Sequence, residues 1–341
     1  MDDLSPKERI SRAFDKKTVD RPPVVCPGGM MNAAIVEVME RGGNRLPEAH
    51  FSPELMAALS RDVREGTGFE NYGVPFCMTV EAEVLGSEVD HGTLECEPKI
   101  RKERYADVSE AGGIDAAGAL RRGRVAAVAE AVSRIAAKGG DVPVIGSVTG
   151  PISLAASLVD PMSFLKGLRK DSANAHRVLA AVTDFLVGYA RLLAESGADA
   201  ISIGDPTATG EILGPKMFEE YALRYINKLI DGIRVTGVPV IAHICGRLDS
   251  VKGYIPAIRA QAISADALVN LRLLKAEFPQ LTTMGNLSTF TLEFGDPEKV
   301  ARQTELLLRD GIDIIAPACG LSTSSSLDNI RALTGTVKGG A

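Results

Sequence analysis

Three residues of types that bind zinc lie at the ends of two apolar segments. The segment 238–242 is apolar and leads to His243 and Cys245, and the next residue is glycine. The segment 312–318 is also mostly apolar and leads to Cys319, again followed by glycine. Short apolar runs of this kind are typical of buried parallel strands, in which residues i and i+2 point to the same side. These three side chains therefore predict a zinc site with three protein ligands and one open position, the pattern of catalytic zinc.

Other interpretations of these residues stay open at this point. Buried cysteines are common, and a histidine in an apolar segment is often part of the core. A Cys–His nucleophile pair would leave Cys319 without a role, and the chain has no Cys-x-x-Cys motif for a redox pair. The remaining cysteines, Cys26, Cys77 and Cys96, lack zinc-type spacing and are assigned a structural role.

Asp266 follows the next predicted strand, 262–265. Its carboxylate could be a fourth metal ligand, or it could hydrogen-bond His243 from outside the ligand set. It could equally cap the helix that follows. We therefore include Asp266 among the candidate metal ligands.

Four more polar residues are expected near the ends of strands. Glu81 and Glu83 are predicted to share one face near the end of a strand, where they could do acid–base work, bind a cationic or hydroxylated group, or pair with Arg or Lys. Asp205 and Asn286 end two later strands. We assign all four as candidate cofactor-binding residues.

The chain alternates between apolar, strand-like segments and amphipathic, helix-like segments. Helices are expected at 5–16, 30–41, 53–65, 113–138, 161–196 with a break near 170–171, 215–236, 250–260, 297–309 and 324–333. The expected strands are 22–26, one within 74–85, 142–148, 198–204, 238–242, 262–265, 282–286 and 312–318.

Eight such units predict an α/β protein, a single (β/α)₈ TIM barrel formed by residues 1–341. Residues 1–20 are a predicted N-terminal helical extension, and 86–112 a strand-rich excursion. A doubly wound sheet is the alternative. The barrel is favoured because candidate polar residues end six of the strands, and a barrel brings all those ends to one mouth.

Composition limits the possible partners and compartment. The 341 residues are 45% hydrophobic with a net charge of −6 and no basic tract, which argues against nucleic acid. No apolar run reaches the roughly 18 residues of a membrane helix. The N-terminus is charged without a signal-peptide segment, and five cysteines in such a chain favour a reducing cytoplasm.

Several stretches of the chain resemble the uroporphyrinogen decarboxylase superfamily, and within it the methylcobamide:coenzyme M methyltransferases. The resemblance extends over most of the chain. Its motifs are DRPPVVCPGGMM (20–31), GVPFCMTVEAEVLG (73–86), HICG (243–246), MGNLS (284–288) and IIAPACG (314–320). The decarboxylases themselves are less similar, because their arginine-bearing motif would fall at 27–32, where this chain has no arginine.

The resemblance implies a zinc-containing barrel that transfers a methyl group from a corrinoid, carried by a partner protein, to a small thiol such as coenzyme M. The family's zinc ligands fall on His243, Cys245 and Cys319. The more distantly similar cobalamin-independent methionine synthases add a glutamate, whose position corresponds to Asp266 here.

The chemistry of thiols is consistent with this expectation. A thiol becomes a good nucleophile when it loses its proton, and coordination to zinc favours the resulting thiolate. Two other functions remain open. One is a demethylase component that transfers methyl from an ether or amine to cob(I)alamin. The other is a decarboxylase-like or zinc-binding protein without methyl transfer.

Overall fold

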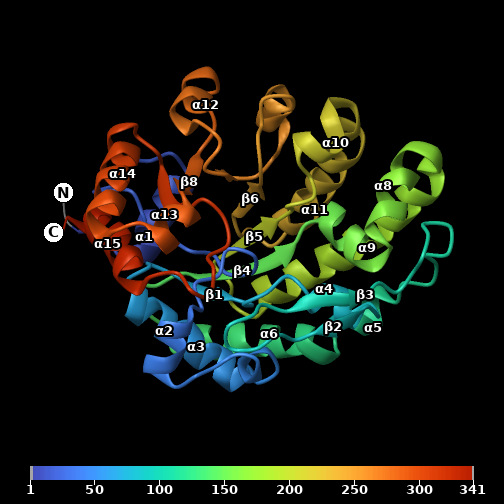
Figure 1. The fold of residues 1–341 in the computed structure, drawn as a ribbon, viewed down its shortest axis with the longest axis horizontal. Helices are drawn as coiled ribbons and strands as arrows, with labels where there is room; N and C mark the ends of the chain where they lie inside the picture. The colour runs from blue at the N-terminus through green and yellow to red at the C-terminus, as the bar shows by residue number, and fades with distance from the viewer. Residues whose placement is uncertain (1–2, 340–341) are drawn as a thin grey trace.

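The computed structural model describes residues 3–339, and its centre is a curled sheet of seven parallel strands (Figure 1). In pairing order these are β1 (Tyr72–Val74), β4 (Val144–Thr149), β5 (Ala200–Gly204), β6 (Val240–Ile244), β7 (Ala262–Ala265), β8 (Thr283–Leu287) and β9 (Ile314–Pro317). Each new strand joins the same edge, with helical crossovers between strands. The predicted α/β class is confirmed.

Helices surround this sheet. They are α1 (Pro6–Phe14), α2 (Val36–Gly42), α3 (Pro53–Thr67), α4 (Val80–Val84), α5 (Ala116–Ala119), α6 (Gly123–Ala136), α7 (Pro151–Leu158), α8 (Pro161–Lys170), α9 (Ser172–Glu195), α10 (Gly210–Met217), α11 (Arg224–Arg234), α12 (Leu271–Glu277), α13 (Thr289–Phe294), α14 (Pro297–Arg309) and α15 (Leu327–Lys338). Short 3₁₀ helices η1 (Glu48–His50) and η3 (Lys252–Ala257) and the π-helical turn η2 (Phe218–Leu223) complete the set. In Figure 1, α3 and α6 lie along one side of the strands, and α14 and α15 along another.

The residues that point inside the curled sheet change character along the strands. Near the N-terminal ends of the strands these residues are apolar, and they form one core cluster with α1, which contributes Ile10, Ala13 and Phe14. The strand residues of this cluster are Ile145, Ala200, Ile241, Ala262, Met284 and Ile314. Two residues further along β4 to β7 the same face carries Ser147, Ser202, His243 and Ser264. The helix α1 therefore closes the apolar end, and polar side chains gather toward the other end.

The segment predicted as the first strand, 22–26, does not join the ladder. It forms one parallel bridge, between Val24 and Ile315 of β9. Proline has no backbone N–H, so Pro22 and Pro23 remove two donors that a regular strand would use. On its other side the segment is held by side chains, because Val24 N donates to Glu70 and Cys26 N donates to the Asn71 side chain.

The strand predicted within 74–85 is wrong in its extent. Only Tyr72–Val74 is a strand, and Val80–Val84 forms the helix α4. The alternation of Glu81 and Glu83 with small apolar residues suggests a strand, yet in the helix these two carboxylates point to different neighbours. The predicted helix 113–138 is also divided, into α5 and α6.

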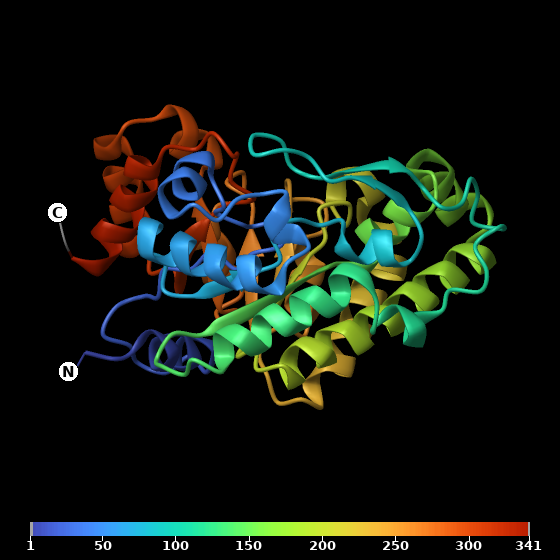
Figure 2. The ribbon, with the colours of Figure 1, turned by 90° about the horizontal axis from the view of Figure 1, so that it is seen from below.

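Residues 86–112 contain an antiparallel hairpin of β2 (Glu88–Asp90) and β3 (Lys99–Lys102). Figure 2 shows the teal hairpin on the upper side of the molecule, and residues at the end of the segment reach α9, where Arg177 donates to the carbonyl of Ser109 at 3.2 Å. The hairpin loop is tied to the chain after β9, because Thr323 Oγ1 donates to the Glu95 carbonyl at 2.6 Å. Within residues 3–339, no helix is long and apolar enough to cross a membrane.

Candidate metal centre and the cavities beside it

His243, Cys245 and Cys319 come together at the ends of β6 and β9. Their ligand atoms all lie within 4.8 Å of one another. His243 Nε2 is 3.1 Å from Cys245 Sγ, and the two sulfurs are 3.7 Å apart. The imidazole is buried, whereas both cysteines are partly exposed. The geometry thus places one nitrogen and two sulfur donors around one point that solvent can reach.

These spacings fit a tetrahedral zinc ion. With Zn–S bonds of about 2.3 Å and Zn–N bonds of about 2.05 Å, tetrahedral angles separate two sulfurs by about 3.8 Å and a nitrogen from a sulfur by about 3.6 Å. The observed sulfur pair matches the first value, and the nitrogen–sulfur pair is shorter than the second by about half an ångström. A set of one imidazole and two thiols is also a donor set that zinc prefers.

Ser264 fixes the orientation of the His243 ring. Its Oγ is 2.9 Å from His243 Nδ1, and its hydroxyl donates toward the sulfur of Met31. With the serine oxygen facing Nδ1, the other ring nitrogen, Nε2, is directed at the two sulfurs, the position from which an imidazole binds a metal ion.

Electrostatics within the triad favour one thiolate. A hydrogen bond from the Cys245 thiol, together with His243 and the Gly320 amide, lowers the pKa of Cys319 to about 4 against the opposing effect of burial. The same contact with Cys319, followed by burial, raises the pKa of Cys245. The pair therefore shares one proton at neutral pH, and the negative charge on Cys319 attracts a cation.

Backbone geometry and close packing explain why a glycine follows each cysteine. Gly246 has a φ of +71°, which favours glycine. A Cβ on Gly320 would lie 2.4 Å from the backbone carbonyl oxygen of Met30, which cannot be accommodated without a shift. Both Cys-Gly pairs thus let the chain turn closely around the site.

Asp266 lies outside the group of three ligands. One carboxylate oxygen accepts from Gly246 N at 3.3 Å and the other from Leu268 N at 3.0 Å. The hydrogen-bond partner of His243 is Ser264 and not Asp266. Asn286 is nearby, and its amide donates to the carbonyls of Asp266 and Val269, each at 2.8 Å. Both residues thus shape the loop beside the metal centre.

Glu81 and Glu83 point in different directions from α4. Glu81 is buried and accepts hydrogen bonds from the amide and the hydroxyl of Thr149, at the end of β4. Burial raises the pKa of Glu81 to about 7. Glu83 instead pairs with Arg124 and His91. The prediction that these carboxylates share one face is therefore wrong, and the structure does not bring them to the triad.

Asp205, after β5, is fully buried and directed at the first turn of α7. Its carboxylate accepts from Ile152 N at 3.0 Å and from Ser153 N and Oγ at 2.8 and 2.7 Å. Burial raises the pKa of Asp205 to about 6 against these hydrogen bonds. Its backbone N–H donates to the carbonyl of His243 at 3.3 Å, so Asp205 ties α7 to the metal-centre strand.

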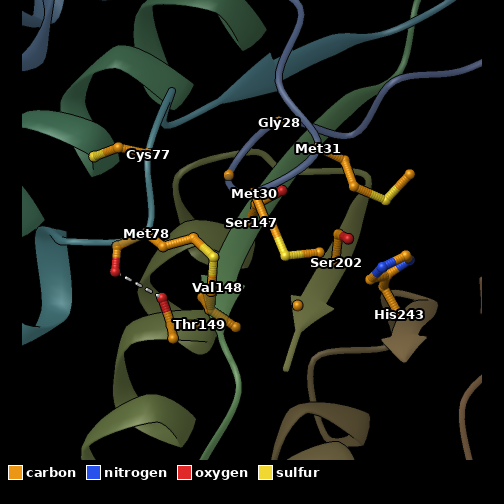
Figure 3. Close-up of a pocket in the computed structure, with 12 residues that line it drawn as sticks. Gly28, Met30, Met31, Cys77, Met78, Ser147, Val148, Thr149, Ser202 and His243 are labelled. Atoms are coloured by element: carbon orange, nitrogen blue, oxygen red, sulfur yellow. Dashed lines mark hydrogen bonds between the residues drawn. The ribbon is translucent and has the colours of Figure 1, made fainter. Parts of the chain in front are cut away.

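A narrow cavity extends inward from His243 (Figure 3). In the figure, His243 and Cys77 lie on opposite sides, with the thioethers of Met30 and Met78 pointing between them. The polar groups of its wall are hydroxyls, from Ser147, Thr149 and Ser202. This inner cavity is uncharged and suits a small, weakly polar group.

A second, wider cavity opens from Cys319 toward the solvent. We call it the outer cavity. The hairpin loop contributes Glu95 and Glu97 to its wall, and α13 contributes Thr289 and Glu293. Its remaining lining residues are Met30, Cys319, Gly320, Leu321, Ser322 and Thr323. Apart from Cys319, these lining residues were not among the predicted site residues, and neither was Ser264. A lone serine in an apolar strand, paired in register with His243, was a signal for Ser264.

Comparisons with known proteins agree with the resemblance seen in the motifs. A family model described as uroporphyrinogen decarboxylase (URO-D) matches residues 5–340. The methylcobamide:CoM methyltransferase MtbA of Methanosarcina acetivorans is 33% identical, with 99% of each chain covered. The methylcobamide:CoM methyltransferase MtaA of Methanosarcina barkeri is 31% identical, with 98% of this chain and 97% of the relative covered.

A solved structure described as a methyltransferase from Methanosarcina mazei has the same fold. It superposes with a TM-score of 0.91 at 30% sequence identity, and the match covers 99% of both chains. The similarity to these relatives, in sequence and in structure, therefore extends over nearly the whole chain. The protein belongs to the uroporphyrinogen decarboxylase family.

Proposed function

We propose that this protein transfers a methyl group from a methylated corrinoid to the thiol of coenzyme M, at a zinc ion held by His243, Cys245 and Cys319. The observation that carries the proposal is the convergence of these three donors within 4.8 Å at the open end of the sheet. The end-to-end similarity to proteins named methylcobamide:CoM methyltransferase supports the choice of substrates.

The roles of the chain's own residues follow from their positions. Zinc, when bound, would act as a Lewis acid that lowers the pKa of the substrate thiol. Cys245 and Cys319 would be its anionic ligands, and two thiolates leave the site with little net charge, so that the substrate sulfur stays nucleophilic. Ser264 would hold the His243 ring with Nε2 toward the metal. Asp266 would act through the Gly246 amide, and a role as fourth ligand stays a prediction.

The corrinoid substrate must reach the same point. The sulfur of the thiol attacks the methyl carbon, and the carbon–cobalt bond breaks with its electron pair left on cobalt. The inner cavity is too narrow for a corrin ring, so we place the corrinoid, carried by a partner protein, over the open end of the sheet. We further propose that segment 22–26 completes an eight-stranded barrel, and that residues 1–341 form one domain. The enzyme would work in the reducing cytoplasm, where Cys245 and Cys319 are not oxidised to a disulfide.

The test combines metal analysis with methyl transfer. Wild-type protein is expected to hold about one zinc per chain and to convert methylcobalamin to cob(I)alamin only when coenzyme M is present. Cys245→Ser and Cys319→Ser are expected to lose the zinc and the spectral change, whereas Cys96→Ser, on the exposed hairpin, keeps both. Equal zinc in all four proteins would reject the site. Methylation of cob(I)alamin from an ether or amine, with no response to thiols, would replace this function by the reverse one.

A further inference from the structure

A thiol that becomes a thiolate at the metal centre must give its proton to another group. The inner cavity offers only hydroxyl, thiol and thioether groups and the ligand His243. The outer cavity carries three carboxylates, Glu95, Glu97 and Glu293, and no cationic side chain lines it. Asp266, beside the triad, already accepts two backbone hydrogen bonds and is a candidate ligand. We therefore seek the proton acceptor among the three carboxylates of the outer cavity.

Of the three carboxylates in the outer cavity, Glu97 is the one whose pKa responds to the Cys319 sulfur. Partial burial raises the pKa of Glu97, hydrogen bonding to Asn32 lowers it, and the nearby Cys319 sulfur raises it further. Glu293 already has a partner, because its carboxylate accepts a hydrogen bond from the Ser324 hydroxyl at 2.5 Å. Glu95 belongs to the exposed end of the hairpin loop and is anchored through its backbone carbonyl.

Glu97 lies between a buried asparagine and solvent. The Asn32 amide lies 3.5 Å from Glu97 Oε1, and the same amide nitrogen donates to the carbonyls of Gly29 and Phe76 at 3.3 Å. The Asn32 oxygen accepts from Ala34 N. This asparagine is buried, whereas the Glu97 side chain remains exposed on its other side. A carboxylate that lines the cavity of Cys319 and also reaches solvent can take a proton from the first and release it to the second.

We propose that Glu97 is the catalytic base that accepts the proton of the substrate thiol, an inference that rests on the proposed function. The S–H bond breaks as the thiol binds at the metal centre, and the proton goes to the Glu97 carboxylate. The sulfur keeps the electron pair that later forms the bond to the methyl carbon. Glu97 then releases its proton to solvent, so that each turnover delivers one proton and leaves the enzyme unchanged.

The titratable groups around Glu97 come from three further elements. They are Cys319 after β9, His50 of η1, and Glu293 of α13, together with Glu95 on its own hairpin. Burial lowers the pKa of His50 to about 3, so this imidazole is neutral in the pH range of the test. The effect of Glu97 on the rate between pH 6 and 9 is therefore isolated by comparing variants that each remove a single carboxylate.

The test compares wild type, Glu97→Gln and Glu95→Gln, all loaded with zinc, with methylcobalamin and coenzyme M as substrates. Glu97→Gln is expected to lower kcat about 100-fold at pH 7 without raising KM. Its rate should recover about tenfold per pH unit as free thiolate replaces the missing base. Glu95→Gln removes the same charge from the same loop and should keep the wild-type pH profile. Glu97→Asp should restore part of the rate.

A second readout does not depend on turnover. Coenzyme M is added without corrinoid at pH 6 to zinc-loaded protein in weak buffer with a pH indicator. Followed by stopped flow, both proteins should release one proton per thiol bound, but Glu97→Gln about 100-fold more slowly, because the proton must leave without the carboxylate. An unchanged rate of proton release and an unchanged pH profile in Glu97→Gln would overturn this role while wild-type turnover still supported the proposed function. No transfer by wild type to any thiol would reject both.

Discussion

A buried carboxyl group links the helix α4 to the sheet close to the inner cavity. Glu81 accepts two hydrogen bonds from Thr149, and burial raises its pKa to about 7 from an ordinary value of 4.5. Between these pH values the folded protein keeps a proton that the unfolded chain loses. The free energy of unfolding therefore falls as pH rises through this range, by about 3 kcal/mol for this group.

Glu81→Gln is expected to remove this fall in the free energy of unfolding at higher pH. The glutamine oxygen accepts from Thr149 N, and its N–H donates to the threonine hydroxyl oxygen. The protonated carboxyl does the same when the hydroxyl donates to the Met78 carbonyl, 3.2 Å away. In urea unfolding the variant should match wild type near pH 4.5 and be more stable at pH 8, by about 1–3 kcal/mol. A smaller decline below pH 6 should remain, because burial also raises the pKa of Asp205.

Glu83→Gln is the matched control on the same helix. Its hydrogen bonds to Arg124 and His91 lower the pKa of Glu83 despite burial, so its charge stabilises the fold above the ordinary pKa. This variant should lose stability at neutral pH. Curves for Glu81→Gln and wild type that run parallel from pH 4.5 to 8 would contradict the assignment.

At the scale of single residues, the sequence identified the three ligands because each ends an apolar strand. It could not separate the roles of Glu81 and Glu83. Alternation over four residues is shared by strands and short helices, and only the position of Thr149 and Arg124 decides which neighbour each carboxylate meets. Glu97 lies in a charged hairpin, and only the fold brings it to the cavity that Cys319 also lines.

At the scale of elements, the metal centre depends on two turns that pass close to other backbone. After β9 the chain at Gly320 lies against the Met30 carbonyl, where a Cβ would approach to 2.4 Å. The Met30 segment also lines both cavities. The position of Cys319 is therefore set by this contact between segments that are far apart in sequence.

Gly320→Ala is expected to weaken zinc binding, by about 10- to 100-fold as for outer-shell changes at metal sites, since the turn must shift and take Cys319 with it. Gly253→Ala is the control, because it adds a methyl group where nothing lies within 4 Å. Zinc affinity is measured by competition with a chelator, and unfolding by circular dichroism. Equal affinities in the two variants would show that the turn adapts without moving the ligand.

At the scale of the whole molecule, the first and last strands meet through the N-terminal segment. The apolar pattern predicted six strands of the ladder, β4 to β9, because each is buried on both faces. It placed β1 too late in the chain, since Tyr72 and Gly73 are only partly buried. It could not show how 22–26 pairs, since two prolines remove regular donors and side chains replace them. Glu70 is the centre of this junction, with charged hydrogen bonds from Arg9 and Arg21 and one from Val24 N.

Glu70→Gln tests how strongly this junction holds the molecule together. The carboxylate is 4% exposed and pairs with Arg9, itself 3% exposed, so the substitution leaves a buried guanidinium with one carboxylate fewer. Removing one partner of such a buried pair costs about 3–5 kcal/mol. The exposed pair Lys17–Asp15 provides the control, because Asp15→Asn should cost less than about 1 kcal/mol. Chemical unfolding measures both values, and chelator competition then shows whether loosening the junction beside Ile315 also weakens zinc at Cys319. A cost for Glu70→Gln no larger than that of Asp15→Asn would mean that the segment 22–26 is held by its bridge to β9 and by Asn71, without a large share from Glu70.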